Sequence, residues 1–152
     1  MLQGGGPKDV VKLVLDLAEQ VSNAKRPQLA AWLKDGTAWK KFISLVYAQD
    51  GDASTLEKLG EVHRAPVVQP FPAKSAGIVK KMDAEAIGRV SLLLGGGREK
   101  ADDAVDFAVG LSGIKKIGER VAKGEPLLTI HARTDQSLRL VKPLIEAAVE
   151  VR

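Results

Sequence analysis

The sequence has 152 residues, of which 45% are hydrophobic and 28% charged, and its formal net charge is +4. This balance is ordinary for a globular protein with a buried core, and it excludes a wholly disordered chain. Cysteine is absent, which excludes disulfides and thiolate zinc sites and favours a reducing, cytoplasmic environment. No apolar run approaches the roughly 18 residues of a membrane span, and no signal peptide is visible, so we expect no membrane partner.

Basic residues are mixed with acidic ones along the whole chain. They occur in pairs such as Lys40-Lys41 and Lys115-Lys116, and aromatic residues make up only 4% of the sequence. A nucleic-acid surface would combine a basic stripe with interleaved aromatic side chains. We therefore interpret the basic pairs as solvated surface and expect no nucleic-acid partner.

The first 61 residues are predicted to be helical, with no strand. Pro7 and Pro27 each suit the first turn of a helix, and Gly36 suits a helix end. Apolar residues recur at helical spacing between these signals. The helical predictions cover residues 7–22, 27–36 and 37–51, with Thr37 as the cap of the third helix and a further turn around residues 56–59.

A change in composition near Glu61 and Val62 predicts a domain boundary. Residues 62–74 contain Pro66, Pro70 and Pro72, which forbid a helix and favour an extended connector or an edge strand. Beyond them we predict strands at 77–82, 107–114 and 127–131, and helices at 83–94 and 135–149. Pro143 predicts a kink in the last helix, or a start as late as Leu140. The fold class expected is α+β, with a helical segment at 1–61, a proline-rich connector at 62–74 and a β-rich domain with flanking helices at 75–152.

The segment from Asp106 to Ala132, DFAVGLSGIKKIGERVAKGEPLLTIHA, is the most informative part of the chain. Two apolar runs flank a polar stretch that contains Gly118 and Gly124. The turn at Gly124–Pro126 fits a β-hairpin with a tight return. This pattern is typical of small β-barrel domains at the end of larger enzymes.

The same segment closely resembles the C-terminal domain of pyrimidine-nucleoside phosphorylases, the family that includes thymidine phosphorylase. There an Asp and an "AVG" strand are followed by "KKIGDRV", "KGE" and a strand ending in "IH". Three further segments resemble the family in the same order: GGGPKDVVKLVLDLAEQV at 4–21, GTAWKKFISLVYAQDGDAS at 36–54 and SAGIVKKMDAEAIGRVSLLLGGGREKADDAVDFAVG at 75–110. Asp50 replaces a Gly of the family pattern, and Gly96 replaces an Ala. The chain therefore resembles the C-terminal portion of such an enzyme.

The resemblance implies a fold, a reaction and partners. Residues 1–61 would form part of the phosphorylase α/β lobe, and residues 75–152 an α/β-hammerhead domain of barrel-sandwich type. The full enzyme would be a pentosyltransferase of pyrimidine metabolism that converts nucleoside and phosphate into base and pentose 1-phosphate, without a cofactor. The family is homodimeric, but its dimer contacts lie mainly in an N-terminal helical domain. The resemblance is therefore compatible with a monomeric state for this chain as well as with a dimer.

The residues that perform the chemistry are not expected in this segment. The family's phosphate-binding "K-x-S-x-GG-x-GD" loop and its "S-x-R-x-x-x-x-T-GGT-x-D" substrate signature have no match in the chain. We therefore assign no catalytic residue and expect the 152 residues alone to be inactive. The alternative is a stand-alone scaffold or partner-binding domain without catalytic function.

The glycine-rich stretch at residues 95–100 is the leading candidate for contact with a ligand. Glycines allow the backbone to approach a ligand, and an arginine can bind a phosphate or carboxylate with two hydrogen bonds. The stretch follows a helix and does not precede one, which favours a helix end and a surface loop over a phosphate cradle. In the family the matching loop faces the cleft between the lobes. The candidate substrate or closure residues are Gly95, Gly96, Gly97, Arg98 and Lys100, with plain anion binding by Arg98 and Lys100 as a weaker alternative.

Other motifs carry less weight. His63 and His131 are the only histidines, and we expect structural roles for both. No histidine or acidic cluster has the spacing of a metal site, and no cofactor is expected. Lys80 and Lys81 weakly resemble a biotin-acceptor lysine, but they lead from a strand into a helix, whereas an acceptor lysine lies at an exposed hairpin tip.

Overall fold

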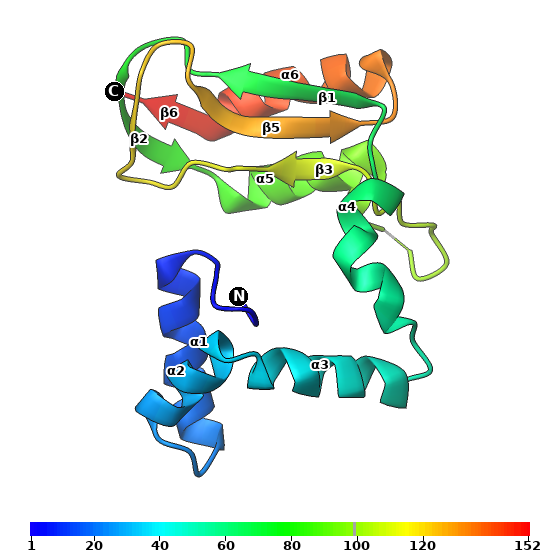
Figure 1. Cartoon of the computed structure of the whole chain (residues 1–152). Coiled ribbons are helices and arrows are strands. Elements are labelled where there is room, and N and C mark those ends of the chain that lie inside the picture. Colours follow the sequence, from blue (N-terminus) through cyan, green and yellow to red (C-terminus); the bar gives the residue numbers. More distant parts are fainter. Residues whose placement is uncertain (99) are drawn as a thin grey trace. The chain divides into compact units, whose positions relative to one another are not determined.

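The computed structural model describes residues 1–98 and 100–152 (Figure 1). The chain divides into two compact units, Met1–Lys58 and Leu59–Arg152. Within the described residues, no helix has both the length and the apolar character needed to cross a bilayer.

The first unit consists of helices, as the sequence predicts. Its elements are α1 (Lys8–Val21), α2 (Arg26–Lys34), α3 (Thr37–Ala48) and the 3-10 helix η1 (Ala53–Lys58). Pro27 lies in the first turn of α2, where its missing N–H costs no helical hydrogen bond. Gly36 has a left-handed φ of 84° and precedes α3, so Gly36, and not Thr37, occupies the N-cap position. A small core of Leu15, Leu29 and Leu33 holds α1 and α2 together.

The second unit combines short strands with helices. It contains α4 (Leu59–Val62), β1 (Val67–Pro72), β2 (Gly77–Met82), α5 (Ala84–Ser91), the π-helical turn η2 (Leu92–Gly96), β3 (Gly110–Ser112), β4 (Arg120–Val121), β5 (Pro126–Ala132), α6 (Asp135–Ala148) and β6 (Val149–Val151). In the described part of the chain, the strands form two three-stranded antiparallel sheets in the orders β1-β5-β3 and β4-β2-β6. The α+β class is thereby confirmed.

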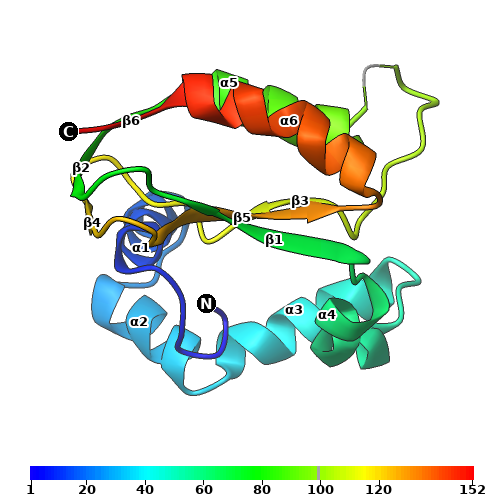
Figure 2. The same cartoon turned by 90° about the horizontal axis from the view of Figure 1, so that it is seen from above.

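The sheet β1-β5-β3 and the helices α5 and α6 form the main walls of the core of this unit, to which Val79 on β2 and Val121 on β4 also contribute. Figure 2 shows α5 and α6 lying across one face of the sheet formed by β1, β5 and β3. Leu128 and Ile130 on β5, Val90 on α5, and Val141 and Ile145 on α6 are all fully buried there. The proline-rich stretch forms the edge strand β1. Pro70 and Pro72 are tolerated there because the outer side of an edge strand has no neighbouring strand to receive a backbone hydrogen bond.

The helices of the second unit begin at side-chain caps. The Asp83 carboxylate accepts a hydrogen bond from the Ala86 N–H at the start of α5, as the sequence predicts. Thr134 and Ser137 form a reciprocal capping box at the start of α6. With this cap in place α6 begins at Asp135 and runs through Pro143, so the late start at Leu140 is wrong.

Three further sequence predictions need correction in this unit. The strand expected at 107–114 shrinks to Gly110–Ser112, because the preceding residues form turns around Asp106. The two apolar runs do pair, as β3 with β5, but the tight hairpin between them is wrong. The intervening β4 leaves that sheet and pairs with β2. The last helix ends at Ala148, since Val149–Val151 pairs with β2 as β6.

Candidate functional site

The glycine loop, meaning residues 95–98 and 100–106, leaves the end of α5 through a π-helical turn. In a π-helical turn the backbone hydrogen bonds join residues five positions apart, instead of four as in an α-helix. Such turns are frequent at functional sites. Gly95 then adopts a left-handed φ of 101°, which ends the helix without the steric cost that a side chain would add. The sequence prediction of a helix end followed by a loop is confirmed.

Gly96 and Gly97 are needed for close packing. A Cβ atom on Gly96 would lie 3.1 Å from both the Ser91 Oγ and the Val109 carbonyl oxygen. A Cβ atom on Gly97 would lie 3.0 Å from the Leu92 Cδ1. The loop therefore leaves the helix in direct contact with both α5–η2 and the start of β3.

The two basic candidates lie at the exposed part of the loop. The Arg98 guanidinium donates a hydrogen bond to the Ala101 carbonyl oxygen over 3.2 Å. The Lys100 N–H donates to the Asp103 carboxylate over 2.9 Å, and the Asp103 N–H donates back to the Lys100 carbonyl oxygen. Glu99, which belongs to the predicted stretch, lies outside the described residues. Exposed guanidinium and ammonium groups here have the chemistry to bind an anion.

Asp106 and Arg133 form a bidentate ion pair at the base of this loop. The Arg133 Nε donates to Asp106 Oδ2 over 2.5 Å, and the Arg133 Nη2 donates to Asp106 Oδ1 over 2.8 Å. The Arg133 guanidinium, together with the Ala108 N–H, lowers the pKa of the Asp106 carboxyl. The same pair raises the pKa of Arg133. The carboxylate is therefore ionised wherever the loop is folded at neutral pH.

Both histidines have structural contacts. The His131 Nε2 and the Ser112 Oγ lie 2.7 Å apart across the paired strands β5 and β3. The rings of His63 and Phe107 meet edge to face with their centroids 5.6 Å apart. Among the described residues, no group of three or more His, Cys, Asp or Glu side chains is placed to hold a metal ion.

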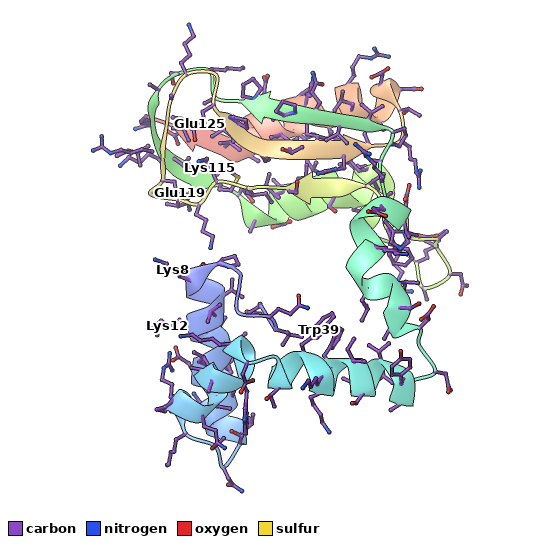
Figure 3. All side chains as sticks on the ribbon, in the orientation of Figure 1. Lys8, Lys12, Trp39, Lys115, Glu119 and Glu125 are labelled. Atoms are coloured by element: carbon purple, nitrogen blue, oxygen red, sulfur yellow. The ribbon has the colours of Figure 1, made fainter. Side chains whose placement is uncertain are left out.

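Three charged residues between β3 and β5, namely Lys115, Glu119 and Glu125, make contacts within this segment, and Figure 3 labels their side chains. The Lys115 Nζ lies 2.8 Å from Glu125 Oε1, while Glu125 Oε2 accepts a hydrogen bond from the Ala122 N–H. The Glu119 carboxylate accepts from the Lys116 N–H. The hydrogen bond from Lys115 lowers the pKa of Glu125, and the hydrogen bond from the Ala122 N–H lowers it further. Lys115, Glu119 and Glu125 of the KKIGERVAKGE pattern therefore have structural roles within their loops.

Sequence reasoning missed Arg133. It singled out Asp106 only as the start of the informative segment. The two partners are 27 positions apart, so no local motif links them. The available signal was the position of Arg133 between the end of a predicted strand and the start of a predicted helix.

Residues 78–152 match the sequence model of the family described as the pyrimidine nucleoside phosphorylase C-terminal domain. Curated relatives extend the similarity toward the N-terminus. A pyrimidine-nucleoside phosphorylase of Bacillus subtilis is 35% identical over 163 aligned residues, which cover 99% of this chain and 38% of the relative. A thymidine phosphorylase of Burkholderia cenocepacia is 42% identical over 120 residues, which cover 78% of this chain and 27% of the relative.

A pyrimidine-nucleoside phosphorylase of Staphylococcus epidermidis is 38% identical over 144 residues, which cover 89% of this chain and 33% of that protein. The chain thus spans between 27% and 38% of the length of these relatives. Since the matching family model is that of a C-terminal domain, the similarity falls in the C-terminal portion of such proteins.

Proposed function

Because the chain belongs to the pyrimidine-nucleoside phosphorylase family and carries its C-terminal domain, we propose that it is the C-terminal part of an enzyme that cleaves pyrimidine nucleosides with phosphate. In that reaction a phosphate oxygen attacks the anomeric carbon of the pentose. The carbon–nitrogen bond to the base breaks, and its electron pair leaves with the base, which then takes up a proton. No electrons are gained or lost overall, so the reaction itself calls for no redox cofactor.

The role of the 152 residues in this reaction is architectural. Catalysis requires groups that stabilise an oxocarbenium-like sugar and the charge on the departing base. The family's motifs for phosphate and base are absent from this sequence. The chain alone is therefore inactive and supplies the lobe against which the catalytic portion is completed.

The observation that carries this proposal is that α1 is apolar on two sides. Val11, Leu15 and Ala18 pack toward α2. A second stripe of Leu13, Leu17 and Val21 is 56%, 54% and 87% exposed, with i, i+4, i+8 spacing. An exposed stripe of large apolar side chains beside a charged helix face is a surface that another protein segment commonly covers. The exposed stripe thus suits a helix that packs against a further lobe.

The second unit contributes the α/β-hammerhead domain of barrel-sandwich type that the family resemblance implies. Its two antiparallel sheets and its α5–α6 layer are compatible with that architecture. The exposed Arg98 and Lys100 of the glycine loop face the cleft of the completed enzyme and contact bound substrate. The completed enzyme acts in the cytoplasm as a homodimer.

A chimera tests the function directly. In it, residues 1–152 replace the matched region of the Bacillus subtilis relative. The 152-residue chain alone should release no uracil or thymine from uridine or thymidine in phosphate buffer, whereas the chimera should release base and form pentose 1-phosphate. Base release by the chain alone, in proportion to protein concentration, contradicts the assigned inactivity. A folded chimera without activity contradicts the assigned role.

Two variants of the chimera test whether the exposed apolar stripe of α1 packs against the catalytic portion. Leu13→Glu combined with Leu17→Glu places charge on the exposed stripe and should abolish the gain of activity. Gln20→Glu adds one negative charge at an exposed polar position of α1 and should leave activity unchanged. Either single leucine change should have a weaker effect than the pair.

The same stripe also favours the second candidate function, a stand-alone partner-binding domain. An exposed apolar helix face can bind another protein without any catalytic portion. An inactive, folded chimera together with a stable complex between the 152-residue chain and another polypeptide would favour this alternative.

A further inference from the structure

Asp106 contacts every segment that meets at the base of the glycine loop. Its N–H donates to the Gly95 carbonyl oxygen over 2.9 Å, which brings the first and last residues of the loop together. Its Oδ1 accepts from the Ala108 N–H over 3.0 Å, and its carbonyl oxygen accepts from the Val109 N–H over 3.4 Å. One residue thus fixes the end of the π-helical turn, the loop and the approach to β3.

Arg133 connects this base to the rigid part of the unit. It directly follows β5, whose residues Leu128 and Ile130 are fully buried, and it directly precedes the Thr134 cap of α6. Its two parallel hydrogen bonds fix both the distance and the orientation of the Asp106 carboxylate. A single-point contact from a lysine would fix the distance alone.

We propose that Asp106 and Arg133 act as a positioning pair that holds the base of the glycine loop on the sheet, so that Arg98 and Lys100 are presented in one orientation. The pair does not touch the reacting atoms. Its effect on the loop follows from the described contacts alone, whereas its effect on phosphorolysis rests on the function proposed above.

The packing of the glycines explains why a fixed base matters for this loop. A Cβ atom would be in tight contact with the Val109 carbonyl oxygen at Gly96 and with the Leu92 side chain at Gly97, so the loop leaves η2 close against both segments. Within the described residues, the Asp106 N–H to Gly95 bond is the direct backbone bond between the two ends of the loop. Loss of the carboxylate anchor removes the restraint on the residue that makes this bond.

Amide hydrogen exchange on the 152-residue chain tests the pair without any substrate. In Arg133→Gln, exchange at the Asp106 and Ala108 amides should accelerate about tenfold, because these groups lose the anchored carboxylate. Exchange at Ile130, in the middle of β5, should stay unchanged. Tryptic cleavage after Arg98 and Lys100 should accelerate in parallel.

Arg139→Gln is the matched control, since it removes an exposed arginine from α6. Arg133→Lys should restore part of the protection, because lysine keeps the charge and loses the second hydrogen bond. The proposal is overturned if Arg133→Gln and Arg139→Gln give the same exchange at Asp106. It is also overturned if the Asp106 and Ala108 amides exchange equally fast in Arg133→Lys and Arg133→Gln while exchange at Ile130 rises in both variants. Arg133 would then stabilise the whole fold and not the loop in particular.

The chimera supplies the readout for the reaction. There Arg133→Gln should lower kcat/KM by about tenfold or more, as expected when a substrate-positioning element is displaced, and Arg139→Gln should not. A chimera that is inactive with every residue intact contradicts the proposed function but leaves the exchange result standing. An active chimera in which Arg133→Gln changes neither exchange nor kcat/KM overturns the positioning role alone.

Discussion

Gly77 and Arg152 are packed backbone to backbone. A Cβ atom on Gly77 would lie 2.6 Å from the Arg152 carbonyl oxygen, closer than any real Cβ contact allows. The neighbouring Ile78 N–H donates to that same oxygen, and the Arg152 N–H donates to the Ile78 carbonyl oxygen. Glycine at position 77 is therefore what permits the last residues to pair with β2.

Gly77→Ala should separate these strands. The Arg152 backbone cannot move away from the added methyl group without losing its two hydrogen bonds to Ile78. We therefore expect the free energy of unfolding to fall by about 1–3 kcal/mol. Gly88→Ala is the contrasting variant, because an added Cβ in α5 meets nothing within 4 Å. It should stabilise the protein by about 0.5–1 kcal/mol. Urea unfolding followed by far-ultraviolet circular dichroism measures both changes, and equal effects from the two variants would contradict the packing argument.

The sequence predicts elements well where the signal is local. The helices of the first unit follow from apolar spacing between Pro27, Gly36 and similar signals, and β2 and β5 follow from apolar runs bounded by turn residues. The predictions for the hairpin and for the end of the last helix are wrong because both features depend on pairing between distant segments. Whether Val149 continues a helix or pairs with β2 depends on a partner at Met82, and local propensity does not contain that information.

The candidate site shows the same division. The glycine stretch at the end of α5 could be found because glycine and arginine carry local meaning. Its anchor could not, since Arg133 acquires its role only when β5 brings it to Asp106. Residues that position a loop from another element have no sequence motif of their own, and a resemblance to a family does not supply one.

The end of α3 is a Schellman motif with an aspartate in the position that favours glycine. The Gly51 N–H donates to the Val46 carbonyl oxygen and the Asp50 N–H donates to that of Tyr47, while Asp50 has a φ of 57°. The phosphorylase pattern that the sequence resembles has a glycine where Asp50 stands. Asp50→Gly should therefore stabilise the first unit by about 0.5–1 kcal/mol, because the left-handed conformation costs glycine nothing.

Tryptophan fluorescence reports on this change selectively, since the sequence has 2 tryptophans and both, Trp32 and Trp39, belong to the first unit. Gly51→Ala should act in the opposite direction, because its Cβ atom would lie 2.9 Å from the Val46 Cγ1. A lower urea midpoint for Asp50→Gly than for the unchanged chain would refute the assignment.

Lys115 and Glu125 should make the stability of the second unit dependent on acid pH. Lys115 lowers the pKa of Glu125, so Glu125 binds protons less readily in the folded state than in the unfolded state. The resulting stabilisation is fully present above the ordinary glutamate pKa and is lost as pH falls through the lowered folded value. Lys115→Met should raise the pKa of Glu125 and weaken this dependence. Carboxyl carbon chemical shifts of Glu125 measured against pH follow the change directly.

Lys123→Met is the control for that titration, because Lys123 is an exposed lysine close to Glu125 in sequence. It removes the same charge without removing the 2.8 Å contact between Lys115 and Glu125. Equal changes in the Glu125 titration for the two variants would show that general charge, and not the specific contact, lowers the pKa.

The two apolar sides of α1 should respond differently to substitution. Leu15 is 9% exposed and packs in the core of the first unit, whereas Leu17 is 54% exposed on the second stripe. Leu15→Ala should cost about 2–4 kcal/mol in the free energy of unfolding, because it leaves a cavity. Leu17→Gln should change it by no more than about 0.5 kcal/mol, as for most surface positions. Tryptophan fluorescence in urea measures both values. In the chimera the same Leu17→Gln should become destabilising, since the stripe is then buried against the catalytic portion, and an unchanged midpoint there would mean that this face of α1 has no partner in the enzyme.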